Sequence, residues 1–250
     1  MVGGVDSPSV PVADVFDEAR RVLAAGAELP LKLIGGVAVA LAAGQEPLLP
    51  REYGDLDFAT MRGRGPEAAA LLERLGYRGD RRFNGLHGHR RLLFFDEVHE
   101  RKLDVFVGHF EMCHHLPISE RLALGAETLP LADLLLTKLQ VVALNEKDER
   151  DIINLLYHHK LDREQGIDAG YVARLCAGDW GLWKTVTLNL ERTRTDVARY
   201  GLTAEQEELI RSRIDDLRRG IDEEPKGARW RLRARVGERV KWYEEPEEVG

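Results

Sequence analysis

Leu31-Lys32-Leu33-Ile34-Gly35-Gly36-Val37 is the stretch that decides the fold. A short apolar run before two glycines predicts a buried strand over 31–34 that ends in a tight turn. The Ala- and Leu-rich residues 37–43 predict a helix directly after the turn. Glycine lets the backbone come close to a ligand, and a helix N-terminus presents free N–H groups to an anion. The stretch therefore predicts a phosphate cradle at Gly35 and Gly36.

A second stretch, Gly54-Asp55-Leu56-Asp57-Phe58, follows the first along the chain. A strand over 55–60 would place Asp55 and Asp57 on one face, about 7 Å apart, because side chains alternate along a strand. Carboxylate oxygens at this spacing can share Mg²⁺, a hard cation that prefers oxygen ligands. Asp-X-Asp also occurs in turns, helix caps and solvated strand edges, so the pair alone does not establish a metal site.

A third acid, Asp104, lies in the apolar stretch 102–107, which predicts a strand. Residues 91–95 predict its partner, and the polar connector 96–101 indicates a hairpin between them. An isolated carboxylate is costly to bury, so its position needs a reason. Asp104 is the candidate third carboxylate of a two-metal site. The alternative is an ion pair with an arginine such as Arg51 or Arg91.

The remaining pattern is mainly helical. Helices are predicted over 12–25, 66–75, 131–144 and 146–158, and residues 162–242 are helical in composition. We therefore expect an α/β fold, with a small mixed sheet and flanking helices in a first domain over 1–160. A helical C-terminal region is expected over 161–250.

Composition limits the classes of protein. The chain is 44% hydrophobic and 32% charged, which is typical of a globular protein. It contains no apolar stretch long enough for a transmembrane helix, and its first residues do not resemble a signal peptide. Two isolated cysteines, Cys113 and Cys176, favour a reducing cytoplasm. The net charge of −7 argues against tight non-specific binding of nucleic acid, unless basic residues gather locally.

The order of these motifs resembles the DNA polymerase beta-like nucleotidyltransferase superfamily. The motifs are Leu33-Ile-Gly-Gly-Val-Ala-Val-Ala-Leu, Arg51-Glu-Tyr-Gly-Asp-Leu-Asp-Phe and Leu103-Asp-Val-Phe. Leu131-Ala-Asp-Leu-Leu-Leu-Thr-Lys138-Leu and Glu146-Lys-Asp-Glu-Arg-Asp151-Ile-Ile resemble its AbiEii-type and related minimal members. Some of those members are toxins of toxin–antitoxin pairs. The resemblance covers roughly residues 30–160.

The resemblance implies a role for each matching residue. Gly35 and Gly36 would hold the triphosphate. Asp55, Asp57 and Asp104 would be the catalytic and metal-binding acids, with two Mg²⁺ ions, or Mn²⁺ in their place, and Asp104 as the candidate general base. One departure is Gly36, which stands where many members have a serine, so one hydroxyl contact to phosphate is missing.

Three further residues are candidates for the nucleotide site, and the resemblance implies two of them, Lys138 and Asp151. Lys138 would contact phosphate, and Asp151 would orient it or the acceptor, although spacing does not decide between Asp148 and Asp151. Arg51 would reach substrate phosphate, or else neutralise the acidic cluster in the free enzyme. Lys138 lies on an otherwise apolar helix face, so its side chain can also snorkel to solvent.

Arginines recur near the C-terminus, and Arg231, Arg235 and Arg239 would line one face of a helix at four-residue spacing. They would contact an RNA backbone, with Trp230 and Trp242 available for stacking. The alternative, which we favour, is a solvated helix whose charge is balanced by nearby glutamates.

The predicted function is metal-dependent transfer of a nucleoside monophosphate from an NTP such as ATP to a hydroxyl of RNA, for example tRNA, or of protein. A cognate antitoxin would be a partner if the chain is a toxin. One alternative is a catalytically degenerate nucleotide-binding or antitoxin-like module. Another is a glycosyltransferase, whose Asp-X-Asp holds a metal-bound sugar nucleotide, but that class usually needs a larger nucleotide-binding domain.

Overall fold

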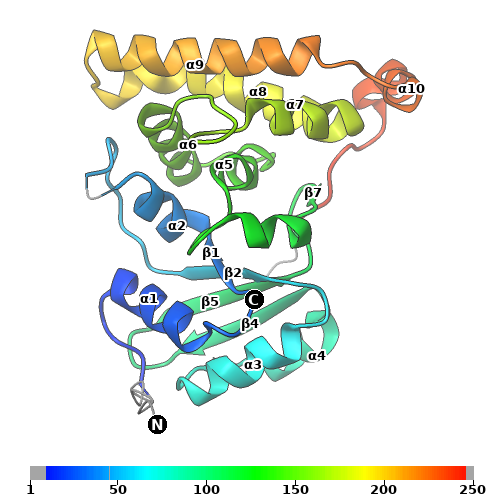
Figure 1. Ribbon diagram of the computed structural model, residues 1–250. Coiled ribbons are helices and arrows are strands. Elements are labelled where there is room, and N and C mark those ends of the chain that lie inside the picture. Colours follow the sequence, from blue (N-terminus) through cyan, green and yellow to red (C-terminus); the bar gives the residue numbers. More distant parts are fainter. Residues whose placement is uncertain (1–9, 45, 246–250) are drawn as a thin grey trace. The chain divides into compact units, whose positions relative to one another are not determined.

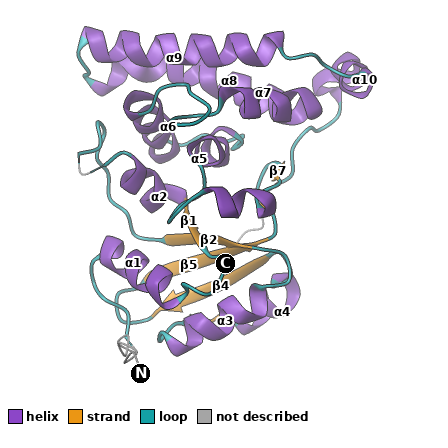
Figure 2. Cartoon of the chain, in the orientation of Figure 1, coloured by secondary structure: helices purple, strands orange, loops and turns teal. Residues whose placement is uncertain are grey.

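The computed structural model describes residues 10–44 and 46–245, and these divide into two compact units. The sheet unit takes in the described residues up to Ala38, together with Glu52–Phe110 and Pro117–Leu129. The helical unit takes in Val39–Arg51, Glu111–Leu116 and the described residues from Pro130 onwards. The chain is thus a mixed α/β protein with a helical C-terminal region, which confirms the predicted fold class (Figures 1 and 2).

A five-stranded mixed sheet forms the centre of the sheet unit, in the order β1-β2-β5-β4-β3. The strands are β1 (Lys32–Ile34), β2 (Leu56–Thr60), β3 (Arg78–Gly79), β4 (Arg91–Asp96) and β5 (Arg101–Val107). The pair β2–β5 is parallel, and the other three pairs are antiparallel. The predicted hairpin is confirmed, because β4 and β5 pair antiparallel from Asp96↔Arg101 to Arg91↔Phe106.

Helices accompany this sheet. They are α1 (Val15–Ala25), α2 (Gly35–Ala42), α3 (Gly65–Arg74), α4 (Arg81–His87) and the 3-10 helix η1 (Ser119–Leu124). Helix α1 starts three residues later than predicted, because the carboxylate of Asp14 caps the N–H groups of Phe16 and Asp17. Helix α3 carries its proline in the first turn, as expected.

Two adjacent cross-strand rows of the sheet differ sharply in character. In one row, Leu33 pairs with Phe58, Phe58 with Val105 and Val105 with Leu92, and all four are buried. In the next row, Ile34 pairs with Asp57, and Asp57 pairs with Asp104. Successive residues of a strand face opposite sides, so the apolar row anchors the sheet to its core while the second row brings two acids together on the other face.

The helical unit is built from the later helices. They are α5 (Leu131–Leu139), α6 (Glu146–His158), α7 (Ala169–Gly178), α8 (Trp180–Asp196), η2 (Val197–Tyr200), α9 (Ala204–Glu223), α10 (Ala228–Val236) and η3 (Gly237–Arg239). Helix α6 has the predicted bounds. Helix α9 starts with the capping box of Thr203 and Gln206, because each side chain bonds the backbone N–H of the other residue.

Two predicted features differ from the observed arrangement. The predicted division after residue 160 falls inside the helical unit, because α5 and α6 pack with α8 and α9. The predicted basic helix face is wrong for Arg239, because α10 ends at Val236 and Gly237 adopts a positive φ of 60°. Short strands β6 (Phe110–Glu111) and β7 (His115–Leu116) form a second sheet. No helix of the described residues has the length and apolar character needed to cross a bilayer.

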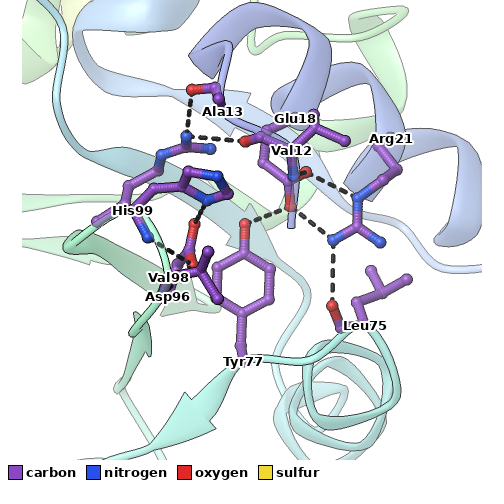
Figure 3. A network of polar contacts seen from close by, with 10 residues as sticks. Val12, Ala13, Glu18, Arg21, Leu75, Tyr77, Asp96, Val98 and His99 are labelled. Carbon is purple, nitrogen blue, oxygen red and sulfur yellow. Dashed lines mark hydrogen bonds and ion pairs between the residues drawn. The ribbon is translucent and has the colours of Figure 1, made fainter. Parts of the chain in front are cut away.

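A network around the buried carboxylate of Glu18 ties α1 to Tyr77 and, through the Arg21 guanidinium, to the Leu75 carbonyl at the end of α3 (Figure 3). Glu18 is fully buried, and it accepts hydrogen bonds from the guanidinium of Arg21, the hydroxyl of Tyr77 and the backbone N–H of Val12. The donor–acceptor distance is 2.5 Å for the Tyr77 hydroxyl. Burial, and then the Glu18 carboxylate, raise the pKa of Tyr77 above its ordinary value. The buried charge is therefore stabilised by three donors.

We expect Tyr77→Phe to lower the free energy of unfolding by about 1.5–3 kcal/mol, because a hydrogen bond to a charged group is lost in a buried place. Urea denaturation followed by circular dichroism measures the change. Arg20→Gln is the matched control, because Arg20 makes a solvent-exposed ion pair on the same helix and such pairs contribute about 1 kcal/mol or less. Equal losses in the two variants would contradict the stabilising role of the network.

Candidate active site

The turn between β1 and α2 depends on Gly35. This residue has a φ of +69°, which L side chains rarely adopt, and α2 begins at Gly35 rather than at the predicted Val37. A Cβ on Gly35 would overlap Oδ2 of Asp57 and would lie 2.9 Å from its Cβ and Cγ. The turn and the acidic strand thus meet at close range, which only glycine permits.

Asp57 and Asp104 are direct neighbours on the parallel strands β2 and β5. Neighbouring strands lie about 4.8 Å apart, so paired residues present their side chains side by side on one face. Asp57 is half-buried, and Asp104 is buried. Asp55 is exposed and precedes β2, which starts at Leu56 rather than at the predicted Asp55. The fold therefore brings two of the three predicted acids together and leaves Asp55 at the entry to their strand.

Asp104 forms ion pairs with two cations. Arg91 Nε lies 2.8 Å from Oδ1 of Asp104, and Lys102 Nζ lies 3.1 Å from Oδ2. The Arg91 guanidinium also lies over the rings of Phe83 and Phe106, at 5.7 Å and 5.1 Å from their centroids. An ion pair with Arg91 was the alternative predicted for Asp104. This ion pair offsets the cost of burying the carboxylate.

The ligand atoms of these three acids suit a divalent metal, but the acids are not arranged as a metal centre. Asp55, Asp57 and Asp104 offer only carboxylate oxygens, the ligands of Mg²⁺. Among the residues described, however, no group of three or more His, Cys, Asp or Glu side chains gathers as a metal centre. Asp104 would have to exchange Arg91 and Lys102 for the metal. Asp55 and Asp57 are therefore the acids best suited to hold an ion without breaking these pairs.

We expect Gly35→Ala to destabilise the sheet unit by about 1–3 kcal/mol, because it forces a residue with a side chain into a strained backbone and displaces the Asp57 carboxylate. Gly44→Ala is the matched control: Gly44 also has a positive φ of +83°, but its Cβ would meet nothing within 4 Å. Thermal unfolding measures the stability of both variants. Backbone strain lowers the stability of each, whereas displacement of Asp57 lowers only that of Gly35→Ala. A loss in Gly35→Ala no larger than in Gly44→Ala would contradict the close approach.

The helical unit brings together the other three residues of the predicted nucleotide site. Asp151 is fully buried and accepts from Arg51 Nε at 3.0 Å and Nη2 at 2.8 Å. Lys138 Nζ lies 2.9 Å from Oδ2 of the same carboxylate. The nucleotide site expected from the sequence included Arg51, Lys138 and Asp151, and in this unit they form one network.

Asp148 belongs to the same network at its solvent side. Its Oδ1 accepts from Lys138 Nζ at 2.8 Å, and its Oδ2 accepts from the side-chain amide of Asn145. Lys138 is buried, so it does not snorkel to solvent. Burial lowers its pKa, but Asp151 and Asp148 outweigh that effect, so the pKa of Lys138 is raised above its ordinary value and the ammonium stays charged.

A cavity of about 580 Å³ opens beside this network, and Arg51 is one of its lining residues. Asn145, Glu146, Lys147 and Arg150 complete the lining, at the N-terminal end of α6. Three cations and the free N–H groups of a helix start favour an anion here. Arg51 and Asn145 thus connect the network to a basic cavity, whereas Asp151 is fully buried and does not line it.

Comparisons with known proteins identify no family for this chain. No family model matches it, and no curated protein matches it. Among solved structures, the solution structure of the antibiotic-resistance factor ANT(2'')-Ia matches with 15% sequence identity and a TM-score of 0.37. That match covers 83% of this chain and 93% of the other. A TM-score this low does not establish a shared fold.

The sequence-based predictions did not include Lys102 as a partner of Asp104, nor the aromatic rings against which Arg91 packs. Lys102 was open to prediction, because it lies two residues before Asp104 on one strand and therefore on the same face. The position of Phe83 against Arg91 was not, since Phe83 comes from α4 and only the folded chain brings it to the hairpin.

Proposed function

We propose that this chain is a metal-dependent nucleotidyltransferase that moves a nucleoside monophosphate from an NTP to an acceptor hydroxyl. The observation that carries the proposal is the position of Asp57. It packs against the Gly35 turn on one side and pairs with Asp104 on the other. A turn suited to phosphate beside two neighbouring acids is the arrangement that nucleotidyl transfer needs. The motif resemblance supports the same interpretation.

In the proposed reaction the acceptor oxygen attacks the α-phosphorus of the NTP. A new P–O bond forms, the bond to the bridging oxygen of the β-phosphate breaks, and pyrophosphate leaves. The hydroxyl proton passes to a carboxylate, for which Asp104 is the candidate. Magnesium bound by Asp55 and Asp57, with Asp104 as a third ligand, would neutralise charge on the phosphates. Mn²⁺ has the same ligand preference.

The chain's own residues then have distinct tasks. Gly35 and Gly36 let the backbone approach the triphosphate at the start of α2. Arg91 and Lys102, which neutralise Asp104 in the structure, supply positive charge on the face where phosphate charge develops. Such fixed charges stabilise a transition state because they need no reorganisation during the reaction.

The proposed roles of Arg51, Lys138 and Asp151 rest on their network in the helical unit. Arg51 lines the basic cavity and can meet phosphate there. Lys138 is held by two carboxylates, so its task is to position Asp148 and Asp151 unless a substrate phosphate replaces one of them. Of the two acids, Asp151 fits the positioning role better, because it is fully buried and binds both cations.

A direct assay tests the proposal. The full-length protein is incubated with each of four α-labelled NTPs, magnesium, and pools of tRNA, total RNA and protein. Label is expected in one pool with one preferred nucleotide, and chelation of the metal is expected to abolish it. Absence of label in every pool would contradict the proposed transferase activity.

A catalytically inactive nucleotide-binding module is the rival function, and calorimetric titration with a non-hydrolysable NTP separates binding from transfer. The proposed enzyme binds the analogue more tightly with magnesium than without it and also transfers label. Magnesium-dependent binding without transfer to any pool would favour the module. A preference for a sugar nucleotide over an NTP would instead favour a glycosyltransferase.

A further inference from the structure

A second cavity of about 580 Å³ lies within the helical unit, away from the residues assigned above. The loop between α7 and α8 forms one side of it, and α10 and the segment after η3 form another. The C-terminal segment runs from α10 towards β7, shown in red in Figure 1, where the Glu244 N–H donates to the Cys113 carbonyl at 3.0 Å. We name this cavity the tryptophan pocket, after Trp180, Trp230 and Trp242 in its lining.

The indole rings of the pocket are fixed in place. Trp230 donates its ring N–H to the Cys176 carbonyl at 3.0 Å, and Trp242 donates to the hydroxyl of Thr185 at 3.1 Å. Trp180 packs edge-on against Trp242, with 6.4 Å between ring centroids. Rings held by their polar ends lose little freedom when a ligand stacks on them, which favours binding.

Cations surround these rings. Arg229, Arg233 and Lys241 line the pocket. The guanidinium of Arg233 lies 4.6 Å over the Trp180 ring and donates to the carbonyls of Gly237 and Val240, so it holds the lining together. Lys241 pairs with Glu245. Arg229 is exposed, and the structure gives it no hydrogen bond or ion pair with the residues it describes, which makes it the cation best able to meet a ligand.

Two acids, Asp179 and Glu244, also line the pocket. Oδ1 of Asp179 accepts from the N–H groups of Gly181 and Leu182 as the cap of α8. The other acid, Glu244, is exposed on the C-terminal segment. Lys241 is paired with Glu245, and Asp179 is partly neutralised by a helix start, so Arg229 and Arg233 face Glu244 as the remaining acid. This balance disfavours a polycation and favours a ligand with negative charge.

We propose that the tryptophan pocket binds a nucleoside monophosphate unit, with its base against the half-buried rings of Trp230 and Trp242 and its phosphate at Arg229. Base–aromatic stacking contributes about 1–3 kcal/mol per base, and arginine pairs well with phosphate oxygens. The volume lies within the range of small-ligand sites. The unit comes either from a free nucleotide or from the end of a single RNA strand, since both present the same chemistry.

Quenching of intrinsic tryptophan fluorescence tests this, because a stacked base quenches an indole. The full-length protein is titrated, in buffer with chelator and no magnesium, with the four nucleoside monophosphates, ribose 5-phosphate and a single-stranded RNA pentamer. Quenching by a monophosphate assigns the free nucleotide, and quenching by the pentamer alone assigns the strand end. Ribose 5-phosphate, which lacks a base, is expected to bind at least tenfold more weakly.

Arg229→Gln is expected to raise the dissociation constant about tenfold or more, the effect of losing one charge-assisted hydrogen bond. Arg235→Gln is the matched control, because Arg235 is exposed on the same helix and does not line the pocket. Equal weakening in both variants, or no saturable quenching by any ligand, would overturn the proposal. The quenching is expected to persist in Asp57→Asn, so its outcome is independent of the proposed transferase activity.

Discussion

Asp57→Asn is expected to reduce nucleotidyl transfer by about 100-fold or more, the scale on which removal of one electrostatic stabiliser acts. Asp57 is the acid that touches both halves of the proposed site, the Gly35 turn and Asp104. The amide keeps the size of the carboxylate and removes its charge, so metal binding is lost while packing is retained. Initial rates with saturating NTP and acceptor measure the effect.

Asp17→Asn is the matched control for that experiment, because Asp17 is an exposed acid of the same unit, with 69% of its side chain accessible. Its rate is expected to equal that of the wild type. Circular dichroism and thermal unfolding show that each variant is folded. Full activity in folded Asp57→Asn would contradict a catalytic role for Asp57.

Asp151→Asn is expected to lower the free energy of unfolding by about 3–5 kcal/mol, the cost of breaking a buried ion pair by removing one partner. The variant leaves Arg51 and Lys138, with 14% and 11% of their side chains exposed, without their shared carboxylate. Asp148→Asn is expected to cost far less, because Lys138 keeps Asp151. Urea denaturation of both variants measures the difference.

Equal losses of unfolding free energy in the two variants would contradict a larger stabilising role for Asp151 than for Asp148. The double variant Asp151→Asn with Lys138→Met gives a further comparison, since it removes a buried cation together with its partner. We expect it to be more stable than Asp151→Asn alone, because the effects of substitutions at contacting residues on the free energy of unfolding are not additive.

Local patterns predicted local structure well. Three features follow from residues close in sequence: the apolar run before Gly35-Gly36, the hairpin of β4 and β5, and the bounds of α6. These features depend on periodicity and turn chemistry, which a single sequence carries.

Long-range contacts account for what was missed. Glu18 bonds Tyr77 across 59 residues, and Arg51 bonds Asp151 across 100. No spacing rule connects such positions. The division into units follows the packing of α5 and α6 with later helices, whereas the helical composition of residues 162–242 does not report packing. The roles of Gly35, Gly36, Asp55, Asp57, Asp104, Arg51, Lys138 and Asp151 remain predictions until activity is measured.

Comparison of α-labelled with γ-labelled NTP tests the central claim most directly. Wild-type protein with magnesium and the responsive acceptor pool is expected to incorporate the α label only and to release one pyrophosphate for each nucleotide transferred. Incorporation of the γ label would make the protein a phosphotransferase. Incorporation of neither label would contradict the account.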